Sequence, residues 1–482
     1  MIGFGSTRAK KSSDSYRLLN DYLSSSGSSK SPSLKKLEWE ISDPFEIYSR
    51  VYHQFEESFI LESSAGPEEL AEYTFIGFDP EVTLSLFNGI FKENGEPVLE
   101  TSNPLESLKK LERDLQYFAA DNFNRYLGGL VGYVSYDFVR YLEDLPGSGG
   151  DRNFPDLHLG LFTDGIVHDR NRETLTYFYY EKDRSSELKD FLHSDEGRSK
   201  SDFKIDELES DFDEKTFNSR VLKARDYIYS GDIYQSVLSR QLTGTFEGDQ
   251  LQAYKELRKI NPSPYMYHVK FGNRRVIGSS PEELVSVSGD KISTYPIAGT
   301  RSLGRSKIER EKLRTELITD DKERAEHNML VDLARNDVGR VAKFGTVDVP
   351  VYMEVKKFSH VQHIVSRVTG ELARGKTALD ALAALFPAGT VSGAPKVRAM
   401  ELIDKLEISP RAPYGGAVGY ISFTGALDFC ITIRSLFTRE NRISLRAGAG
   451  IVADSKPVKE WEEINHKLEA LKNAVTSGGE AN

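Results

Sequence analysis

The stretch TYPIAGTRSLGRSK, residues 294–307, predicts a strand that ends in a glycine-containing turn followed by a basic run. A long amphipathic helical pattern, DDKERAEHNMLVDLARND at residues 320–337, comes soon after it. The same alternation of strand patterns with long helices runs through residues 216–475. This succession predicts an α/β (α+β) fold in which helices flank β-sheets.

Composition divides the 482-residue chain into five segments. Residues 1–35 are rich in Ser and Lys, and we expect them to be mobile. Residues 36–182 are strand-rich and predict an N-terminal domain, whereas the highly charged residues 183–215 predict a linker. Residues 216–475 would form the second domain, which carries most of the polar, glycine-framed motifs, and residues 476–482 would be a C-terminal tail.

Composition also argues against several classes of protein. No run of about 18 apolar residues occurs, so we expect no transmembrane helix, and the first residues show no secretory signal. The net charge of −11 argues against broad nucleic-acid affinity. The single cysteine, Cys430, cannot form an intrachain disulfide. These features predict a soluble, cytoplasmic protein.

Two helical stretches each carry a pair of glutamates at helical spacing. Glu323 and Glu326 share a face with core residues of the first stretch, and Glu460 and Glu463 do so in SKPVKEWEEINHKLEALKNA, residues 455–474. If the two pairs faced one cleft, they would form an all-oxygen site suited to Mg²⁺. Surface ion pairs are the commoner fate of such glutamates, and the pattern alone favours that alternative.

Glycine-framed segments form a second group of candidates. Glycine lets a ligand approach the backbone, and Thr300, Arg301, Arg434 and Lys467 could complement a carboxylate or phosphate. For any single segment ordinary turn chemistry is the preferred explanation, and none matches a nucleotide-binding loop. The segments are PIAGTR (296–301), FPAGTVSGAPK (386–396), YGGAVGY (414–420) and RAGAGIVADS (446–455).

His363 lies in a strand pattern, FSHVQHIVSRVTGEL, at residues 358–372. An imidazole at that position could exchange protons near neutral pH. A lone histidine on an apolar strand face is more often a core residue, so the pattern leaves both interpretations open.

Taken together and in order, these motifs resemble the anthranilate synthase component I family of chorismate-utilising enzymes. The resemblance covers roughly residues 215–475 and extends into the N-terminal segment through LES, FIGFDP and GGLVGYVSYD. It implies a two-domain fold of large antiparallel β-sheets flanked by helices, with Mg²⁺ as cofactor. The motifs that carry it are SPEEL, YPIAGTR, AEHNMLVDLARND, HVQHIVSRVTGEL, FPAGTVSGAPKVRAMELI, YGGAVGY, CITIRS, RAGAGIVADS and the final E-x-x-E.

The resemblance assigns roles residue by residue. Glu326 and Glu463 correspond to the Mg²⁺ ligands, supported by Glu323 and Glu460 in the catalytic centre. The positions that correspond to substrate contacts are Gly299, Thr300, Tyr414, Arg434, Gly448, Gly450 and Lys467.

Glu282 also falls in the family's active site, and His363 matches the histidine associated with pyruvate elimination. The implied reaction converts chorismate and ammonia to anthranilate and pyruvate in tryptophan biosynthesis. Ammonia would come from a separate glutamine amidotransferase subunit, because Cys430 lies in a strand-like segment and not in a nucleophile turn.

Feedback inhibition by tryptophan is also implied, because two segments resemble the family's inhibitor pocket. The first is LES and the second is NPSPYMY, residues 261–267. Plain strand packing is the alternative for both. The inhibitor contacts expected from them are Leu61, Glu62, Ser63, Pro264, Tyr265 and Met266.

Related activities remain as alternatives. Aminodeoxychorismate synthase component I, which serves folate synthesis, often carries Lys where this chain has Ala298, and isochorismate and salicylate synthases also have a Lys there. A non-catalytic tryptophan-binding module is a third possibility. The intact glutamate pairs and His363 weigh against that module.

Overall fold

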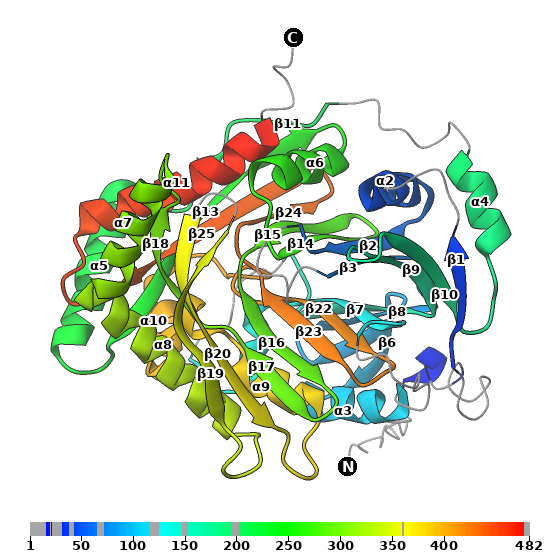
Figure 1. Ribbon diagram of the computed structural model, residues 1–482, viewed down its shortest axis with the longest axis horizontal. Coiled ribbons are helices and arrows are strands. Elements are labelled where there is room, and N and C mark those ends of the chain that lie inside the picture. Colours follow the sequence, from blue (N-terminus) through cyan, green and yellow to red (C-terminus); the bar gives the residue numbers. More distant parts are fainter. Residues whose placement is uncertain are drawn as a thin grey trace, which may run out of the picture.

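The computed structural model describes residues 16–19, 21, 31–37, 43–64, 72–115, 125–146, 153–193, 202–358 and 361–476. Most of the segment expected to be mobile, residues 1–35, lies outside these ranges, as does residue 477 onward. Two large antiparallel sheets pack against each other, and helices cover their outer sides (Figure 1). The expected α/β class with large antiparallel sheets is therefore confirmed.

The first sheet joins strands from both halves of the chain. Two short strands, β12 (Glu209–Ser210) and β21 (Gly393–Ala394), pair with β13 beside the main path. The main path is β1 (Ser33–Leu37), β10 (Thr174–Tyr179), β9 (Asp164–Asp169), β3 (Tyr73–Phe78), β2 (Glu57–Glu62), β14 (Tyr265–Phe271), β15 (Arg274–Ser280), β24 (Ser435–Arg439), β25 (Arg442–Ile451), β13 (Gln235–Glu247) and β11 (Lys204–Ile205).

The second sheet has the same mixed origin. The strand β19 (Asp348–Lys357) pairs with β20 beside the main path. The main path is β18 (Ile297–Ser302), β20 (Val361–Glu371), β17 (Lys291–Thr294), β16 (Glu283–Ser288), β23 (Leu427–Ile431), β22 (Ala417–Ser422), β7 (Gly129–Val134), β8 (Leu157–Phe162), β4 (Val82–Phe87), β5 (Ile90–Glu93) and β6 (Glu96–Glu100).

The expected boundary at residues 183–215 does not separate the two sheets. In the first sheet β2 of the N-terminal segment pairs with β14 of the C-terminal segment. In the second sheet β7 pairs with β22 in the same way. The segment itself contains α4 (Ser185–His193) and the short strands β11 and β12. The two halves of the chain thus share both sheets and the core between them.

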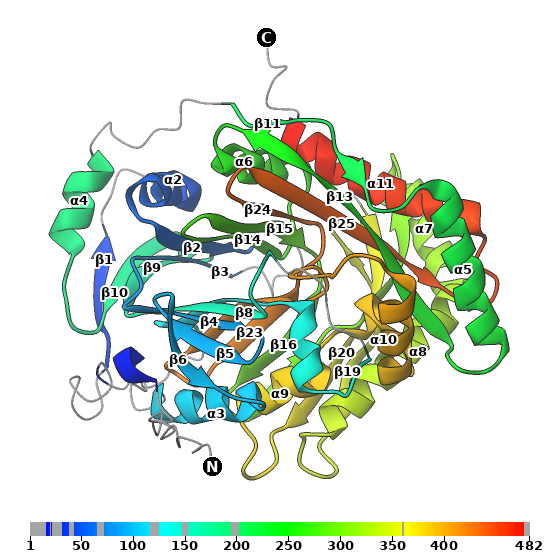
Figure 2. The same ribbon diagram turned by 180° about the vertical axis from the view of Figure 1, so that it is seen from behind.

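Helices cover the outer sides of both sheets. Figures 1 and 2 show α2, α6 and α11 along the first sheet, and α3 and α9 beyond the second. The helices are α2 (Pro44–Gln54), α3 (Pro104–Leu115), α4, α5 (Glu214–Tyr229), α6 (Gln250–Ile260), α7 (Lys307–Thr319), α8 (Asp321–Gly339), α9 (Ala378–Leu385), α10 (Lys396–Leu406) and α11 (Pro457–Thr476), with short 3₁₀ helices at Tyr136–Tyr141 and Gly389–Val391.

Two buried clusters hold these layers together. The larger one lies between the sheets and is rich in aromatic rings, among them Phe59, Phe162 and Tyr420. The other lies between the first sheet and its covering helices, with Ile464 and Leu468 of α11 among its members. Burial of this apolar surface is the main force that fixes the helices on the sheet.

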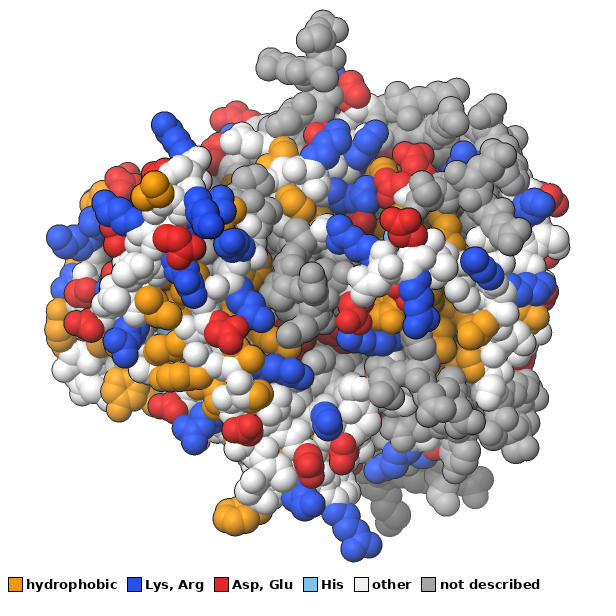
Figure 3. Space-filling model, in the orientation of Figure 1, with side chains coloured by type: hydrophobic (Ala, Val, Ile, Leu, Met, Phe, Trp, Pro, Cys, Tyr) orange, Lys and Arg blue, Asp and Glu red, His pale blue; other side chains and the backbone are white. Residues whose placement is uncertain are grey.

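The surface carries mixed charge. On the face shown in Figure 3, blue and red side chains alternate without a continuous field of one sign. Within the described ranges, no helix has the length and apolar character needed to cross a membrane.

Candidate active site

The site begins at the stretch 294–307, which the sequence predicted to be a strand that ends in a glycine-containing turn. The segment stays in strand β18 through Ser302, and its pairing with β20 shifts between Ala298 and Arg301. Gly299 lies in this bulge with a φ of 66°, a conformation that favours glycine. A Cβ atom there would also lie 2.9 Å from Oε2 of Glu323, so this position brings the strand close to α8.

His363 faces this bulge from the neighbouring strand β20. Its Nδ1 atom lies 2.8 Å from the carbonyl oxygen of Gly299 and 3.1 Å from Oγ1 of Thr300. Because a carbonyl only accepts, Nδ1 carries the proton and Nε2 remains the basic nitrogen. Burial lowers the pKa of His363, an effect that Arg434 reinforces and the Gly299 hydrogen bond opposes. The imidazole is therefore neutral near pH 7 and able to take up a proton.

The two predicted glutamate pairs come together between α8 and α11. Burial raises the pKa of Glu326, and the charges of Glu323, Glu463 and Glu460 raise it further. Burial and Glu463 likewise raise the pKa of Glu460. Because like charges raise one another's pKa only at close range, these carboxylates belong to one acidic group.

The charge of Arg301 is already used within this group. Its Nη1 lies 2.9 Å from Oε1 of Glu323, and its Nη2 lies 3.0 Å from Oδ2 of Asp320. The sequence suggested Arg301 as a partner for a substrate anion. The structure corrects this interpretation, because both ends of the guanidinium hold carboxylates of the protein.

The carboxylates fit a hard divalent cation. Among the described residues Glu326 makes no hydrogen bond or ion pair, and Glu463 is bound only through Oε1, at 2.7 Å from Nζ of Lys467. In the described ranges no three such side chains are already spaced as a metal cage. Oxygen donors are what Mg²⁺ prefers, and a cation would relieve the repulsion that raises the pKa of Glu326.

Two of the glycines predicted as substrate contacts, Gly448 and Gly450, lie on strand β25. A Cβ atom on Gly448 would lie 2.9 Å from Oη of Tyr414, and one on Gly450 would lie 2.6 Å from Nε2 of Gln235. Nζ of Lys467 donates to the Gly448 carbonyl at 2.8 Å. Burial raises the pKa of Tyr414 to about 12, so its hydroxyl remains a neutral donor. Gln235 was not predicted from sequence.

Glu282 and Arg434 form the inner end of the site. Oγ1 of Thr390 donates to Oε1 of Glu282 at 2.9 Å. Burial raises the pKa of Glu282 to about 7, although Thr390 and Arg434 oppose the shift. Burial also lowers the pKa of Arg434, whose guanidinium has no hydrogen bond or ion pair in the described part of the chain. A buried cation in this state is suited to an incoming carboxylate.

Thr390 is a site residue that the sequence did not single out. It belongs to the segment 386–396, which drew attention only for its glycines. Its role depends on Glu282, 108 positions earlier in the chain, so no local pattern could have revealed it.

The six residues expected at an inhibitor pocket are divided between two faces of the first sheet. Glu62 points toward α6, where its Oε2 lies 2.7 Å from Nε of Arg258, and Met266 is buried in the same outer cluster. Leu61 and Tyr265 pack toward the core between the sheets. Ser63 follows β2, and Pro264 precedes β14.

Tyr265 lines a cavity of about 760 Å³ on the inner side. Its hydroxyl donates to Oε2 of Glu283 at 2.9 Å. The same cavity is lined by Arg125, Tyr420 and Asp428, which the sequence did not indicate. Among the described residues, Tyr265 is the one expected inhibitor contact of the six that lines this cavity.

Comparison with known proteins gives one consistent family. A family model described as "chorismate binding enzyme" matches residues 56–473. Anthranilate synthase component 1 of Methanothermobacter thermautotrophicus is 43% identical over 454 residues, covering 94% of this chain and 96% of that protein.

Two solved structures have the same fold. The crystal structure of anthranilate synthase component I from Streptococcus pneumoniae TIGR4 has a TM-score of 0.75 and 34% identity, covering 83% of this chain and 92% of its own. A menaquinone-specific isochorismate synthase from Escherichia coli has a TM-score of 0.71, covering 95% of this chain and 99% of its own. At 19% identity the latter supports the fold alone.

Proposed function

The chain belongs to the chorismate binding enzyme family, and from that premise we propose that it works as anthranilate synthase component I. It converts chorismate and ammonia to anthranilate, pyruvate and water. The observation that carries this proposal is the convergence of an unpaired cation, Arg434, a neutral base, His363, and an acidic group around Glu326. Relatives named anthranilate synthase component 1 support the choice of activity within the family.

Chorismate carries two carboxylates, and the site offers two ways to hold them. The buried guanidinium of Arg434 pairs with one carboxylate, because its charge has no protein partner within the described ranges. Glu326 and Glu463 would hold Mg²⁺, which would supply positive charge for the ring carboxylate and polarisation of the substrate. The missing side chains at Gly448 and Gly450 let Tyr414 and Gln235 lie close against β25, where their polar groups would face the substrate.

The chemistry runs in two stages. Ammonia forms a bond to C2 of the ring, and the C4 hydroxyl leaves as water after the double bonds shift. The proton on C2 is then removed, the bond between C3 and the enolpyruvyl oxygen breaks, and the ring becomes aromatic. Nε2 of His363 is suited to take the C2 proton, because its Nδ1 proton is held by Gly299.

Ala298 fits the choice of ammonia as nucleophile. It pairs with Ile364, the residue next to His363 on β20, and its buried methyl group provides no competing base there. Ammonia is supplied by a separate glutamine amidotransferase subunit. The sole cysteine, Cys430, is buried in β23 with its pKa raised chiefly by burial, and so it is unsuited to be a glutaminase nucleophile.

Tryptophan would act as a feedback inhibitor through the cavity lined by Tyr265. The cavity of about 760 Å³ is large enough for an amino acid and offers both aromatic walls and charged groups, including Arg125 and Asp428. Leu61 lies on β2, the strand paired with β14 beside this region, and Ser63 directly follows that strand.

Purified protein with Mg²⁺, chorismate and ammonium sulfate should develop anthranilate fluorescence without any partner protein. Chelation of the metal should remove the signal. Chromatography of the products distinguishes the alternatives, since an aminodeoxychorismate synthase would release no pyruvate and an isochorismate synthase would need no ammonia. Absence of anthranilate when chorismate and Mg²⁺ both bind would overturn the proposal.

A further inference from the structure

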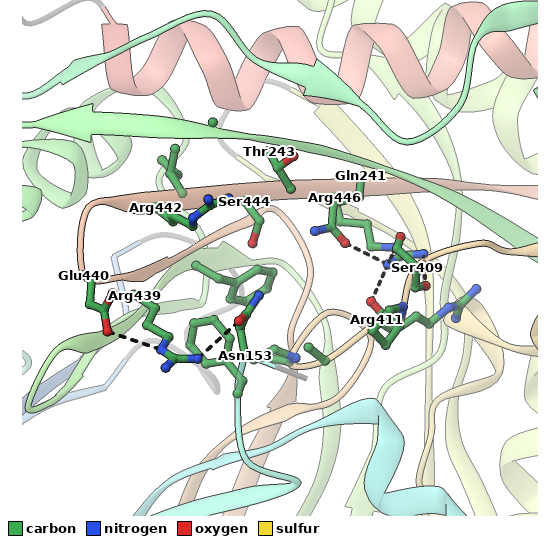
Figure 4. A pocket seen from close by; sticks show the side chains of 17 residues that line it. Asn153, Gln241, Thr243, Ser409, Arg411, Arg439, Glu440, Arg442, Ser444 and Arg446 are labelled. Atoms are coloured by element: carbon green, nitrogen blue, oxygen red, sulfur yellow. Dashed lines mark hydrogen bonds and ion pairs between the residues drawn. The ribbon is translucent and has the colours of Figure 1, made fainter. Parts of the chain in front are cut away.

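A second cavity, of about 590 Å³, lies between β13, β24, β25 and the loop that leads to Tyr414. Its volume falls in the range of small-molecule sites in proteins. Figure 4 shows Arg446 and Arg411 at one end, Arg439 beside Asn153 below, and Arg442 above. The proposed activity uses none of these side chains.

The lining is strongly cationic. Among the described residues it contains four arginines, and Glu440 is the one acidic residue. Arg411 and Arg446 share Glu407, with Arg411 Nη2 at 2.7 Å from Oε1 and Arg446 Nη2 at 2.9 Å from Oε2. One carboxylate behind the wall therefore holds both guanidinium groups and balances one of their two charges.

The other two arginines have little or no compensation. Nη1 of Arg439 lies 3.2 Å from Oδ1 of Asn153, a neutral acceptor, and its Nε lies 3.8 Å from Glu440 without forming a hydrogen bond. The guanidinium of Arg442 has neither a hydrogen bond nor an ion pair within the described ranges. The cavity thus holds more positive charge than the protein itself satisfies.

Apolar surface lies next to these charges. The rings of Phe154 and Phe437 meet edge to face with centroids 6.0 Å apart, and Pro410 and Pro413 also line the cavity. Hydroxyl groups of Thr243 and Ser444 are further lining groups. A simple inorganic ion would use only the charged part of such a site.

The cavity and the proposed substrate site lie on one face of β25. Side chains alternate along a strand, so Arg442, Ser444 and Arg446 point to the same side as Gly448 and Gly450. From Ser444 to Gly448 the strand rises only about 14 Å, at roughly 3.4 Å per residue. The loop carrying Arg411 and Tyr414 forms the wall between them, and the Arg446 guanidinium lies 5.9 Å from the Tyr414 ring centre.

We propose that this cavity binds a small organic anion, one carboxylate or phosphate group attached to an apolar body, as a site separate from that of the substrate. The anionic group pairs with Arg442 and Arg439, and the apolar body packs on Phe154 and Phe437. Occupation of the cavity acts on Tyr414 through the intervening wall, since Arg446 touches both regions.

Isothermal titration of the full chain tests this with two probes, sodium benzoate and inorganic phosphate, at fixed ionic strength and without chorismate. Wild-type protein should bind at least one probe at one site, with a Kd of about millimolar or tighter. Arg442→Gln and Arg439→Gln should each weaken binding about tenfold or more, the usual effect of losing a charge-assisted hydrogen bond. Arg172→Gln is the matched control, because that side chain is 82% exposed and lies away from both sites.

A fourth variant, Arg434→Gln, separates this cavity from the substrate site. The proposal requires that it retain the binding that Arg442→Gln loses. Binding that is lost in Arg434→Gln but kept in Arg442→Gln, binding that is equal in all variants, or no binding of either probe would overturn the proposal. Preference for benzoate would identify the ligand as a carboxylate, and preference for phosphate would identify a phosphate ester. Because no turnover is measured, failure here is distinct from failure of the proposed activity.

Discussion

Two buried glutamates, Glu407 behind the wall of the arginine cavity and Glu282 at the inner end of the proposed active site, differ in how the protein surrounds them. Glu407 accepts hydrogen bonds from the backbone and hydroxyl of Ser239, and it pairs with Arg411 and Arg446. Burial tends to raise its pKa, but the two arginines bring it below the ordinary value. Glu407 is therefore a charged group at any physiological pH.

Within the described ranges Glu282 has one side-chain hydrogen bond, from Thr390, and its pKa is raised to about 7 by burial. Arg434 lies near enough to oppose this shift without forming an ion pair. The protein itself compensates the charge of Glu407. Beside Glu282 it leaves the charge of Arg434 available for a ligand. Complete compensation marks the structural network, and incomplete compensation marks the site that binds and exchanges protons.

Breaking the completed network should have the largest effect. Glu407→Gln leaves Arg411 and Arg446 buried without their shared carboxylate, and the free energy of unfolding should fall by about 3–5 kcal/mol. Urea denaturation followed by circular dichroism measures this. Glu401→Gln is the control, because Glu401 pairs with Arg398 at a partly exposed position and should cost less than about 1 kcal/mol. Equal losses in both variants would show that Glu407 is not special.

Changes at the proposed active site, where charges are incompletely compensated, should alter activity and not stability. Glu326→Gln removes one oxygen donor and one charge from the acidic group, so kcat/KM for ammonia-dependent anthranilate formation should fall by about 10²–10³-fold, corresponding to several kcal/mol of lost metal assistance. Thermal unfolding without metal should be unchanged or shifted upward, because repulsion with Glu323, Glu460 and Glu463 is relieved.

The matched control for that variant is Glu469→Gln, which changes an exposed glutamate of helix α11, whereas Glu326 lies on α8. A titration with Mg²⁺ should show weaker binding in Glu326→Gln than in Glu469→Gln. Activity and Mg²⁺ affinity at the wild-type level in Glu326→Gln would remove that residue from the metal site.

Much of the fold and of the candidate site could be predicted where it depends on residues close together in the sequence. The helical spacing of the glutamates in 320–337 and 455–474 correctly places both pairs on helices α8 and α11. The facing of those two helices comes from sheet packing between distant segments, and helical spacing says nothing about it. Strand alternation alone separates Leu61 from Glu62, so a run of consecutive residues cannot place all its side chains in one cavity.

Contacts between distant segments were beyond the sequence. The stretch 294–307 predicted a strand that ends in a glycine-containing turn, but the bulge at Gly299 depends on pairing with the distant strand β20 and has no local signal. The partners of Glu407 lie on β13, β25 and a loop, and nothing in the sequence around Glu407 marks it as a shared acceptor. Apolar periodicity in the sequence predicts the helices and strands and their buried faces. Charge pairing depends on which segments meet once the sheets have assembled.

The smallest expected effect comes from a variant that shifts the pKa of Glu282 and keeps its carboxylate. Thr390→Val takes away the hydroxyl that favours the charged carboxylate, so the pKa of Glu282 should rise above its value of about 7. A net loss of about 1 kcal/mol for one hydrogen bond corresponds to a rise of somewhat less than one pH unit. Any limb of the kcat/KM profile that reports Glu282 should therefore move to higher pH.

Ammonia titrates identically for every variant, so the ratio of variant to wild-type kcat/KM at each pH isolates the protein group. Thr390→Ser retains the hydroxyl donor to Glu282 and should reproduce the wild-type profile. A shift toward lower pH in Thr390→Val, or the same shift in Thr390→Ser, would mean that the hydroxyl does not stabilise the charged form.

Because Glu407 keeps its arginines, the pKa of that group should not move, and the pH dependence of stability above pH 5 should change only through Glu282. That carboxyl is protonated in the folded state up to about pH 7, so its burial lowers stability as pH rises from about 4.5 to 7, and Thr390→Val should extend this decline to higher pH.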